Sequence, residues 1–169
     1  SMLHQANDAR KHIAYVPEQP AVYGHLSAIE NMRYFLSLSN VKATESEIEN
    51  CLIQVGLNST SWQQTCEEYS KGMKQKVMLA LALAKQAKLL LMDEPNSGLD
   101  PQATEELNQL IIACKNNGMG VLVVTHDVLS ALAFSDQLQM LTQGHLQTVT
   151  LDQSNLSLEH LKQLYLGRA

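Results

Sequence analysis

A chain of 169 residues, 45% of them hydrophobic, is long enough for one compact domain and too apolar for a disordered protein. Its net charge of −5 and a pI near 5.6 argue against a broad nucleic-acid-binding surface. The three cysteines, Cys51, Cys66 and Cys114, are widely spaced, which is typical of reduced thiols in a cytosolic protein. The longest apolar run, residues 77–84, is too short to span a bilayer, so we expect no membrane insertion by this chain.

The first half of the sequence predicts one short strand and then a helical region over residues 27–86. Two of its helices begin at side chains that form capping boxes, Ser27 with Glu30 and Thr44 with Glu47. The expected elements are a strand over 12–17, a loop over 18–27, helices over about 27–38 and 44–56, a polar stretch over 58–68, and a helix over 71–85.

The second half alternates strands with helices, which predicts a parallel α/β layer over residues 89–150. The short apolar runs at 89–92 and 121–124 are typical of strands buried on both faces of a sheet. Asp100 followed by Pro101 marks the start of a helix. The expected elements are strands over 89–92, 121–124, about 136–142 and about 145–150, with helices over about 101–117, 128–134 and from about 157.

Two adjacent carboxylates, Asp93 and Glu94, directly follow the first of these apolar runs. Side chains alternate along a strand, so one carboxylate can hold a metal ion while its neighbour orients water. The alternative is a surface turn with two solvated acids. The buried strand before the pair favours a functional site, because α/β proteins bind ligands at the carboxyl ends of their strands.

Two further features could act on an anion. Ser70, Lys71 and Gly72 begin a helix with free backbone N–H groups and positive charge, although alone they indicate only a well-capped basic helix start. His126 almost directly follows the apolar run 121–124, where it could donate to a phosphate oxygen or position a water. A lone histidine is more often structural, and the other histidines show no metal-ligand spacing.

The order of these pieces resembles the ATP-binding cassette ATPase of ABC transporters over residues 12–150. In this resemblance Asp93 matches the Walker B aspartate, Glu94 the catalytic glutamate and His126 the switch histidine. The other matching segments are the Q-loop at 15–19, the start of the helical subdomain at 23–31, the signature motif at 69–75, the D-loop at 97–100 and the late Asp136…Gly144 pattern.

The resemblance implies an α/β fold with a P-loop NTPase-like parallel sheet, incomplete here, and an ABC helical subdomain. The implied division is a strand and Q-loop of the core at 1–26, a helical signature subdomain at 27–86, a Walker B, D-loop and H-loop core at 87–150, and a C-terminal helix at 151–169.

The resemblance also implies a mechanism in which two cassettes close head to tail around two ATP molecules. Ser70, Lys71 and Gly72 of one cassette would then contact the γ-phosphate held by the other. In this mechanism Asp93 would bind Mg²⁺, Glu94 would polarise water and His126 would sense the γ-phosphate. The Q-loop residues Glu18 and Gln19 would contact the nucleotide site. The D-loop residues Ser97 and Asp100 would make contacts across the dimer interface. The helical subdomain would dock on a transmembrane permease subunit, which places the protein in the cytoplasm at the inner face of a membrane.

Some residues depart from the family pattern. Lys71 replaces the first signature glycine and Met73 the signature glutamine, as in exporters of the ABC-2 type. Glu18 stands at the Q-loop glutamine position, with Gln19 beside it. The sequence contains no G-x-x-x-x-G-K-[ST] phosphate loop, and only 17 residues, none of them glycine, precede Glu18.

These observations predict the ATPase subunit of an ABC transporter, present here as a piece that is inactive alone. The initial Ser1-Met2 is expected to be a cloning remnant. The alternative is a naturally truncated, non-catalytic cassette that acts as an interaction module. A soluble relative in DNA repair or translation is disfavoured, because the sequence has no coiled-coil insert, second cassette or basic surface. An incomplete sheet also predicts an exposed edge strand and self-association.

Overall fold

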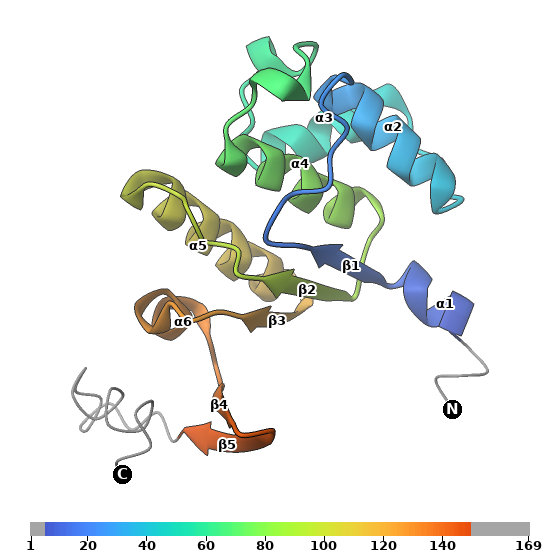
Figure 1. The fold of residues 1–169 in the computed structure, drawn as a ribbon. Coiled ribbons are helices and arrows are strands. Elements are labelled where there is room, and N and C mark those ends of the chain that lie inside the picture. Colours follow the sequence, from blue (N-terminus) through green and yellow to red (C-terminus); the bar gives the residue numbers. More distant parts are fainter. Residues whose placement is uncertain (1–5, 150–169) are drawn as a thin grey trace.

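The computed structural model describes residues 6–149. Their elements follow one another along the chain as Figure 1 shows. In order they are α1 (Ala6–Lys11), β1 (Ile13–Val16), α2 (Ala28–Leu38), α3 (Glu45–Gln54), the 3₁₀ turns η1 (Ser59–Ser61) and η2 (Cys66–Glu68), α4 (Lys71–Ala84), β2 (Leu89–Asp93), α5 (Pro101–Asn116), β3 (Gly120–Val124), α6 (Val128–Phe134), β4 (Leu138–Thr142) and β5 (His145–Val149). Within the described range, no helix is long and apolar enough to cross a bilayer.

A parallel sheet with the strand order β1-β2-β3 lies at the centre of the fold. Ile13 pairs with Leu89 and Leu89 pairs with Gly120, so the three strands start nearly level and their carboxyl ends meet at one edge. The helical region, α2 to α4, packs above this sheet in Figure 1, and α5 runs alongside it. The predicted α/β class, with a parallel sheet and a separate helical region, is confirmed.

The helices begin where the sequence places their caps, because these signals are local. Ser27 Oγ accepts the Glu30 N–H, and Glu30 Oε2 accepts the Ser27 N–H at 2.8 Å, which completes the first capping box. The predicted box of Thr44 and Glu47 is also present at the start of α3. Such caps stabilise a helix by about 1 kcal/mol each.

Helix α4 is the central helix of the hydrophobic core, in contact with both the sheet and the other helices. Its Leu79 and Ala80 are fully buried, and α4 contacts α2, α3, β1 and α5. Leu90 and Met92 of β2 belong to the same buried cluster, to which α2 and α3 also contribute residues. The latter are Ala28, Ile29, Met32, Leu36, Ile48, Cys51 and Leu52.

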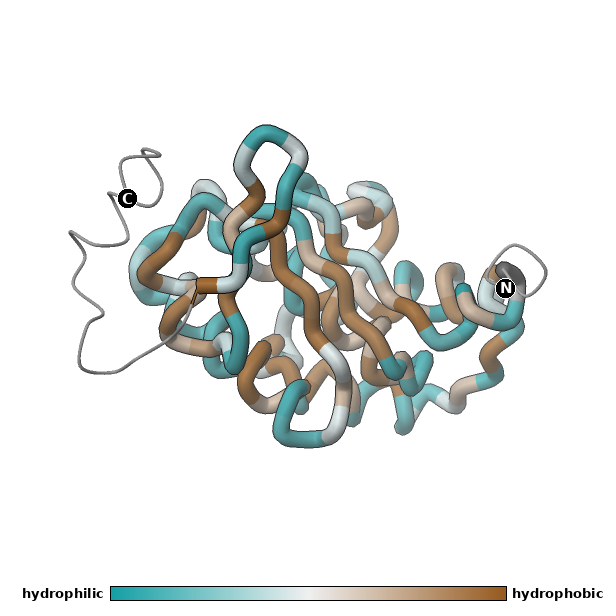
Figure 2. Tube along the Cα trace, turned by 90° about the horizontal axis from the view of Figure 1, so that it is seen from below, coloured by the Kyte–Doolittle hydropathy of each residue, from teal (hydrophilic) through white to brown (hydrophobic). Residues whose placement is uncertain are grey.

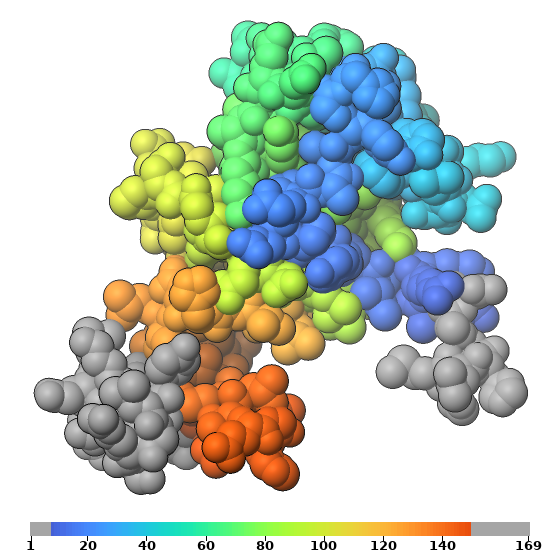
Figure 3. All heavy atoms as spheres, in the orientation of Figure 1, coloured from blue at the N-terminus to red at the C-terminus, as the bar shows by residue number. Residues whose placement is uncertain are grey.

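The structure corrects two predictions about the second half. The run 121–124 is not buried on both faces. In β3, Leu122 and Val124 are 58% and 60% exposed, because β3 is the edge of the described sheet and no helix within residues 6–149 covers that face. Figure 2 shows the apolar strands of this uncovered face from below. In addition, β4 and β5 do not extend the parallel layer but form a separate antiparallel hairpin, which protrudes below the sheet in Figure 3.

Smaller differences concern α1, which the sequence did not predict, and the polar stretch 58–68, which contains the two 3₁₀ turns. The helix expected from about residue 157 lies outside the described residues. The three cysteines are free and buried, as expected for reduced thiols, and burial raises the pKa of each thiol.

Candidate functional site

The carboxyl ends of β2 and β3 bring the two acidic residues beside the polar segment after β3. Asp93 pairs with Val124 as the last residue of the β2–β3 ladder. The Glu94 N–H then donates to the Val124 carbonyl oxygen at 2.8 Å. Glu94 itself has a φ of +44°, a left-handed conformation that non-glycine residues rarely adopt and that turns the chain sharply out of the strand.

The Glu94 carboxylate is oriented by the two residues that follow β3. Its Oε2 accepts a hydrogen bond from Thr125 Oγ1 at 3.1 Å, and its Oε1 accepts one from the His126 backbone N–H at 3.0 Å. His126 Nδ1 lies 2.8 Å from Oε2. This hydrogen bond, together with the negative charge of Glu94, raises the pKa of the exposed His126 ring.

The start of α4 faces the turn that follows β2. Ser70 caps the helix by accepting the Met73 N–H at 3.2 Å. The Lys71 and Gly72 amides have no intrahelical acceptor, because they lie in the first turn of the helix. Lys71 Nζ donates to the Ser97 carbonyl oxygen, so its charge is directed at this turn. A Cβ at Gly72 would lie 3.6 Å from Ala103 Cβ, so the helix start packs close to α5.

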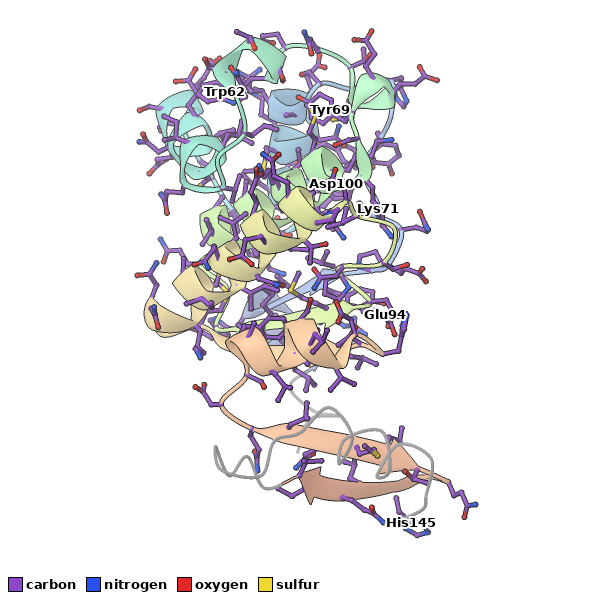
Figure 4. The ribbon with its side chains drawn as sticks, turned by 90° about the vertical axis from the view of Figure 1, so that its left-hand side faces the viewer. Trp62, Tyr69, Lys71, Glu94, Asp100 and His145 are labelled. Carbon is purple, nitrogen blue, oxygen red and sulfur yellow. The ribbon has the colours of Figure 1, made fainter. Side chains whose placement is uncertain are left out.

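The predicted Q-loop and D-loop residues are partly brought together. Ser97 Oγ donates to Glu18 Oε1 at 3.0 Å, while the neighbouring Gln19 is exposed. Asp100 caps α5 by accepting the Ala103 N–H at 2.8 Å. In Figure 4, Lys71, Asp100 and Glu94 project on the same side of the molecule, and His145 lies far away on the β4–β5 hairpin.

Four polar residues around this site were not singled out from the sequence. Thr125 contacts Glu94, as described above. Gln75 donates through Nε2 to the Pro95 carbonyl oxygen, and Asn96 Nδ2 donates to Asn108 Oδ1 at 3.1 Å. A signal for Gln75 exists in the sequence: it lies three, four and seven residues before Met78, Leu79 and Ala82, so it is a polar residue in an apolar helical stripe.

Comparison with known proteins identifies the family and the fold. A family model described as "ABC transporter" matches residues 2–97, more than half of the chain. This chain belongs to the ABC transporter family.

Two curated relatives are named as ATP-binding proteins of transport systems. The lantibiotic transport ATP-binding protein SrtF of Streptococcus pyogenes is 32% identical over 94% of this chain and 66% of its own length. The lipopolysaccharide export system ATP-binding protein LptB of Escherichia coli is 29% identical over 94% of this chain and 67% of its own length. The chain therefore spans about two thirds of the length of these two relatives.

Solved cassettes have the same fold. One structure, described as the ATP-binding subunit of an ABC transporter, is 30% identical with a TM-score of 0.78, over 99% of this chain and 72% of the other. A dimeric ATP-binding cassette in a post-hydrolysis state, MJ0796 bound to ADP and phosphate, is 25% identical with a TM-score of 0.73, over 88% of this chain and 67% of that one.

The residues of this ABC family member fit a nucleotide-bound Mg²⁺ better than a metal site built from protein alone. Among the described residues, the Asp93 carboxylate makes no hydrogen bond or ion pair, so its oxygens are free to bind a hard cation. No group of three or more His, Cys, Asp or Glu side chains in residues 6–149 could hold a metal ion. Magnesium that is bound through one or two carboxylates and substrate phosphates needs no such group.

Proposed function

We propose that this chain is part of an ATP-binding and ATP-hydrolysing subunit that powers transmembrane transport, in the direction of export. The observation that carries this proposal is the arrangement at the end of β2. There the Glu94 carboxylate is oriented by Thr125 and His126, and it is preceded by Asp93, whose carboxylate has no hydrogen-bond or ion-pair partner among the described residues. A held carboxylate beside a free one suits water activation next to a metal-bound phosphate.

Each residue of the site would then have one task. Glu94 orients and polarises the attacking water, and His126 donates a hydrogen bond to the γ-phosphate. Asp93 would hold Mg²⁺, which when bound neutralises negative charge on the phosphates. The amides at the start of α4, near Ser70 and Gly72, would bind the γ-phosphate of a nucleotide held by a second cassette in a head-to-tail dimer. Glu18 and Gln19 would contact the nucleotide site, and Ser97 and Asp100 would contact the second cassette across the dimer interface.

We place the docking surface for a permease subunit on the helical region, where an aromatic cluster is partly exposed. Tyr23 packs edge-on against Tyr34 at 5.1 Å between ring centroids and stacks on Phe35 at 5.7 Å. Partly exposed aromatic residues are enriched at protein interfaces. The surrounding protein would be cytoplasmic and peripheral at the inner face of the membrane.

The direction of transport rests on the signature residues and one relative. Lys71 and Met73 give the signature motif its resemblance to exporters of the ABC-2 type, and the name of LptB specifies export. Against this, a 35% identical relative of Pseudomonas fluorescens, matched over 79% of this chain and 38% of its own length, is named an Fe(3+) ion import protein, FbpC.

By itself, the 169-residue chain is proposed to hydrolyse ATP poorly or not at all. Its sequence has no phosphate loop, whose backbone amides and lysine supply most of the electrostatic stabilisation in phosphoryl transfer. Titration calorimetry with Mg·ATP tests this directly, and micromolar binding would contradict it.

The catalytic assignment is tested on the polypeptide encoded by the whole open reading frame that contains this sequence. Glu94→Gln keeps the side-chain volume and removes the base, so the ATPase kcat is expected to fall by about 10²-fold or more. The control is Glu105→Gln, an exposed change of the same kind on α5. A kcat within about twofold of the unaltered enzyme would refute the role of Glu94.

A second candidate is a non-catalytic interaction module, favoured by a formed signature helix and D-loop in a sequence without a phosphate loop. The genomic codons upstream of Leu3 separate the two. An in-frame G-x-x-x-x-G-K-[ST] motif would exclude the module, whereas a natural start codon would support it.

A further inference from the structure

Two side chains from α4 hold the turn between β2 and α5. Gln75 Nε2 donates to the Pro95 carbonyl oxygen, and Lys71 Nζ donates to the Ser97 carbonyl oxygen. The two residues are four apart and share one face of α4. The orientation of the Gln75 amide follows from chemistry, because only its NH₂ group can donate to a carbonyl.

Gln75 is a costly residue for this place in the core. Its side chain is 0% exposed, and its Oε1 has no hydrogen-bond partner among the described residues. It borders a cavity of about 110 Å³ between α4 and α5, which Gly72 and Leu107 also line. A buried amide with an unsatisfied oxygen destabilises a fold relative to an apolar side chain of similar volume. Packing alone therefore does not account for glutamine here.

The turn that Gln75 holds is joined directly to the Glu94 carboxylate. Pro95 follows Glu94 in the chain, and the Ser97 N–H donates to the Glu94 carbonyl oxygen at 3.1 Å. The carboxylate of Glu94 then accepts the backbone N–H of His126, in the segment that follows β3. A displacement of Pro95 is thus transmitted to the Glu94 side chain and to its bond with His126.

We propose that Gln75 is a positioning residue, which fixes the start of α4 and the Glu94 turn in one geometry. It rests on the proposed function, in which the start of α4 faces a phosphate and Glu94 faces water. Lys71 makes the same connection closer to solvent, whereas Gln75 makes it in the buried core, where a hydrogen bond is stronger. Through Gln75, the helix and the carboxylate would move as one body.

Amide hydrogen exchange tests the proposal without nucleotide. The reporters are the backbone N–H groups of Ser97 and His126, which bond to the carbonyl and the carboxylate of Glu94. In Gln75→Met, which keeps the length of the side chain and removes the donor, both amides are expected to exchange about tenfold faster, the effect of losing one buried hydrogen bond.

Two controls separate positioning from loss of stability. Gln109→Met makes the same change on the exposed face of α5, and both reporters should keep their rates. Leu52→Ala removes a fully buried side chain of α3 and lowers global stability. Its effect should appear at all core amides, with no extra acceleration at Ser97 and His126.

The proposal is overturned if Gln75→Met accelerates exchange only as much as Leu52→Ala does at equal stability, with no excess at His126. If Gln75→Met does not fold, Gln75→Glu gives a second test. Its carboxyl can donate to the Pro95 oxygen only when protonated, so protection of Ser97 relative to the unaltered protein should fall as pH rises. Protection that is independent of pH would refute the link. Neither result depends on whether the complete protein hydrolyses ATP.

Discussion

Asn31 offers a quantitative test of how the loop after β1 is held to the helical region. The side chain is 0% exposed in α2. Its Oδ1 accepts the Tyr23 N–H at 2.8 Å, and its Nδ2 lies within hydrogen-bond distance of the carbonyl oxygens of Tyr23 at 3.0 Å and Ser27 at 2.9 Å. Nδ2 also approaches the Leu26 carbonyl oxygen and Cys66 Sγ, at 3.2 and 3.5 Å.

The magnitude of Asn31→Ala follows from these contacts. An amide has two N–H groups, so the acceptors around Nδ2 share two full hydrogen bonds, and the bond to Oδ1 is added to them. At about 1 kcal/mol each, the loss is about 3 kcal/mol. Alanine has a helix propensity better than asparagine by about 0.5 kcal/mol. The free energy of unfolding is therefore expected to fall by about 2.5 kcal/mol.

Urea denaturation followed by far-ultraviolet circular dichroism measures this loss, with the m-value unchanged. Asn50→Ala is the matched control, because Asn50 is exposed in the middle of α3. There only the propensity changes, so stability should rise by about 0.5 kcal/mol. The two substitutions are thus expected to differ in sign. A loss below about 1 kcal/mol for Asn31→Ala would show that the loop is not held through this side chain.

Three other expectations concern the site and the sheet. Glu94→Gln should lower the raised pKa of His126 in a nuclear magnetic resonance titration, and an unchanged titration would contradict the ion pair. In the unaltered protein the ion pair stabilises the fold fully below the ordinary histidine pKa, and this contribution is lost as pH rises through the raised pKa. Gly98→Ala should lower the free energy of unfolding by about 1 kcal/mol in urea denaturation, because Gly98 has a φ of +70°. Gly72→Ala should not lower it, because a Cβ there would lie in ordinary contact with Ala103, 3.6 Å away, and the reverse order would be evidence against this geometry. The chain should self-associate in light scattering through the uncovered sheet face, less so in Leu122→Lys, and a clean monomer would count against that.

The helix starts could be predicted from sequence because their determinants lie within three residues. Ser27, Thr44, Ser70 and Asp100 each accept a backbone N–H from the residue three positions later, as an N-cap does. No tertiary contact is needed for this bond, so the local sequence specifies it. The same holds for Pro101 after Asp100, since its fixed φ suits the first helical position.

Burial and long-range polar contacts could not be predicted in the same way. The run 121–124 has the composition of a central strand, but its exposure is decided by which strands and helices lie beside it. Gln75 and Pro95 are 20 residues apart, and Glu94 and Thr125 are 31 apart. Their contacts exist only after the strands are in register. Periodicity marks Gln75 as a polar residue on an apolar helix face, but it does not specify its partner.

The difference between Asp93 and Glu94 is also decided by the fold, although the two residues are adjacent and chemically alike. Asp93 is the last residue of the ladder, and its carboxylate is unpaired among the described residues. Glu94 lies one residue later, where its positive φ turns the chain and brings its carboxylate to Thr125 and His126. A cation needs free oxygens, whereas a base for water needs a fixed direction. In the proposed mechanism the backbone turn therefore separates the two tasks. A substitution that relaxes the φ of Glu94 should then impair the proposed base and leave the proposed cation ligand in place.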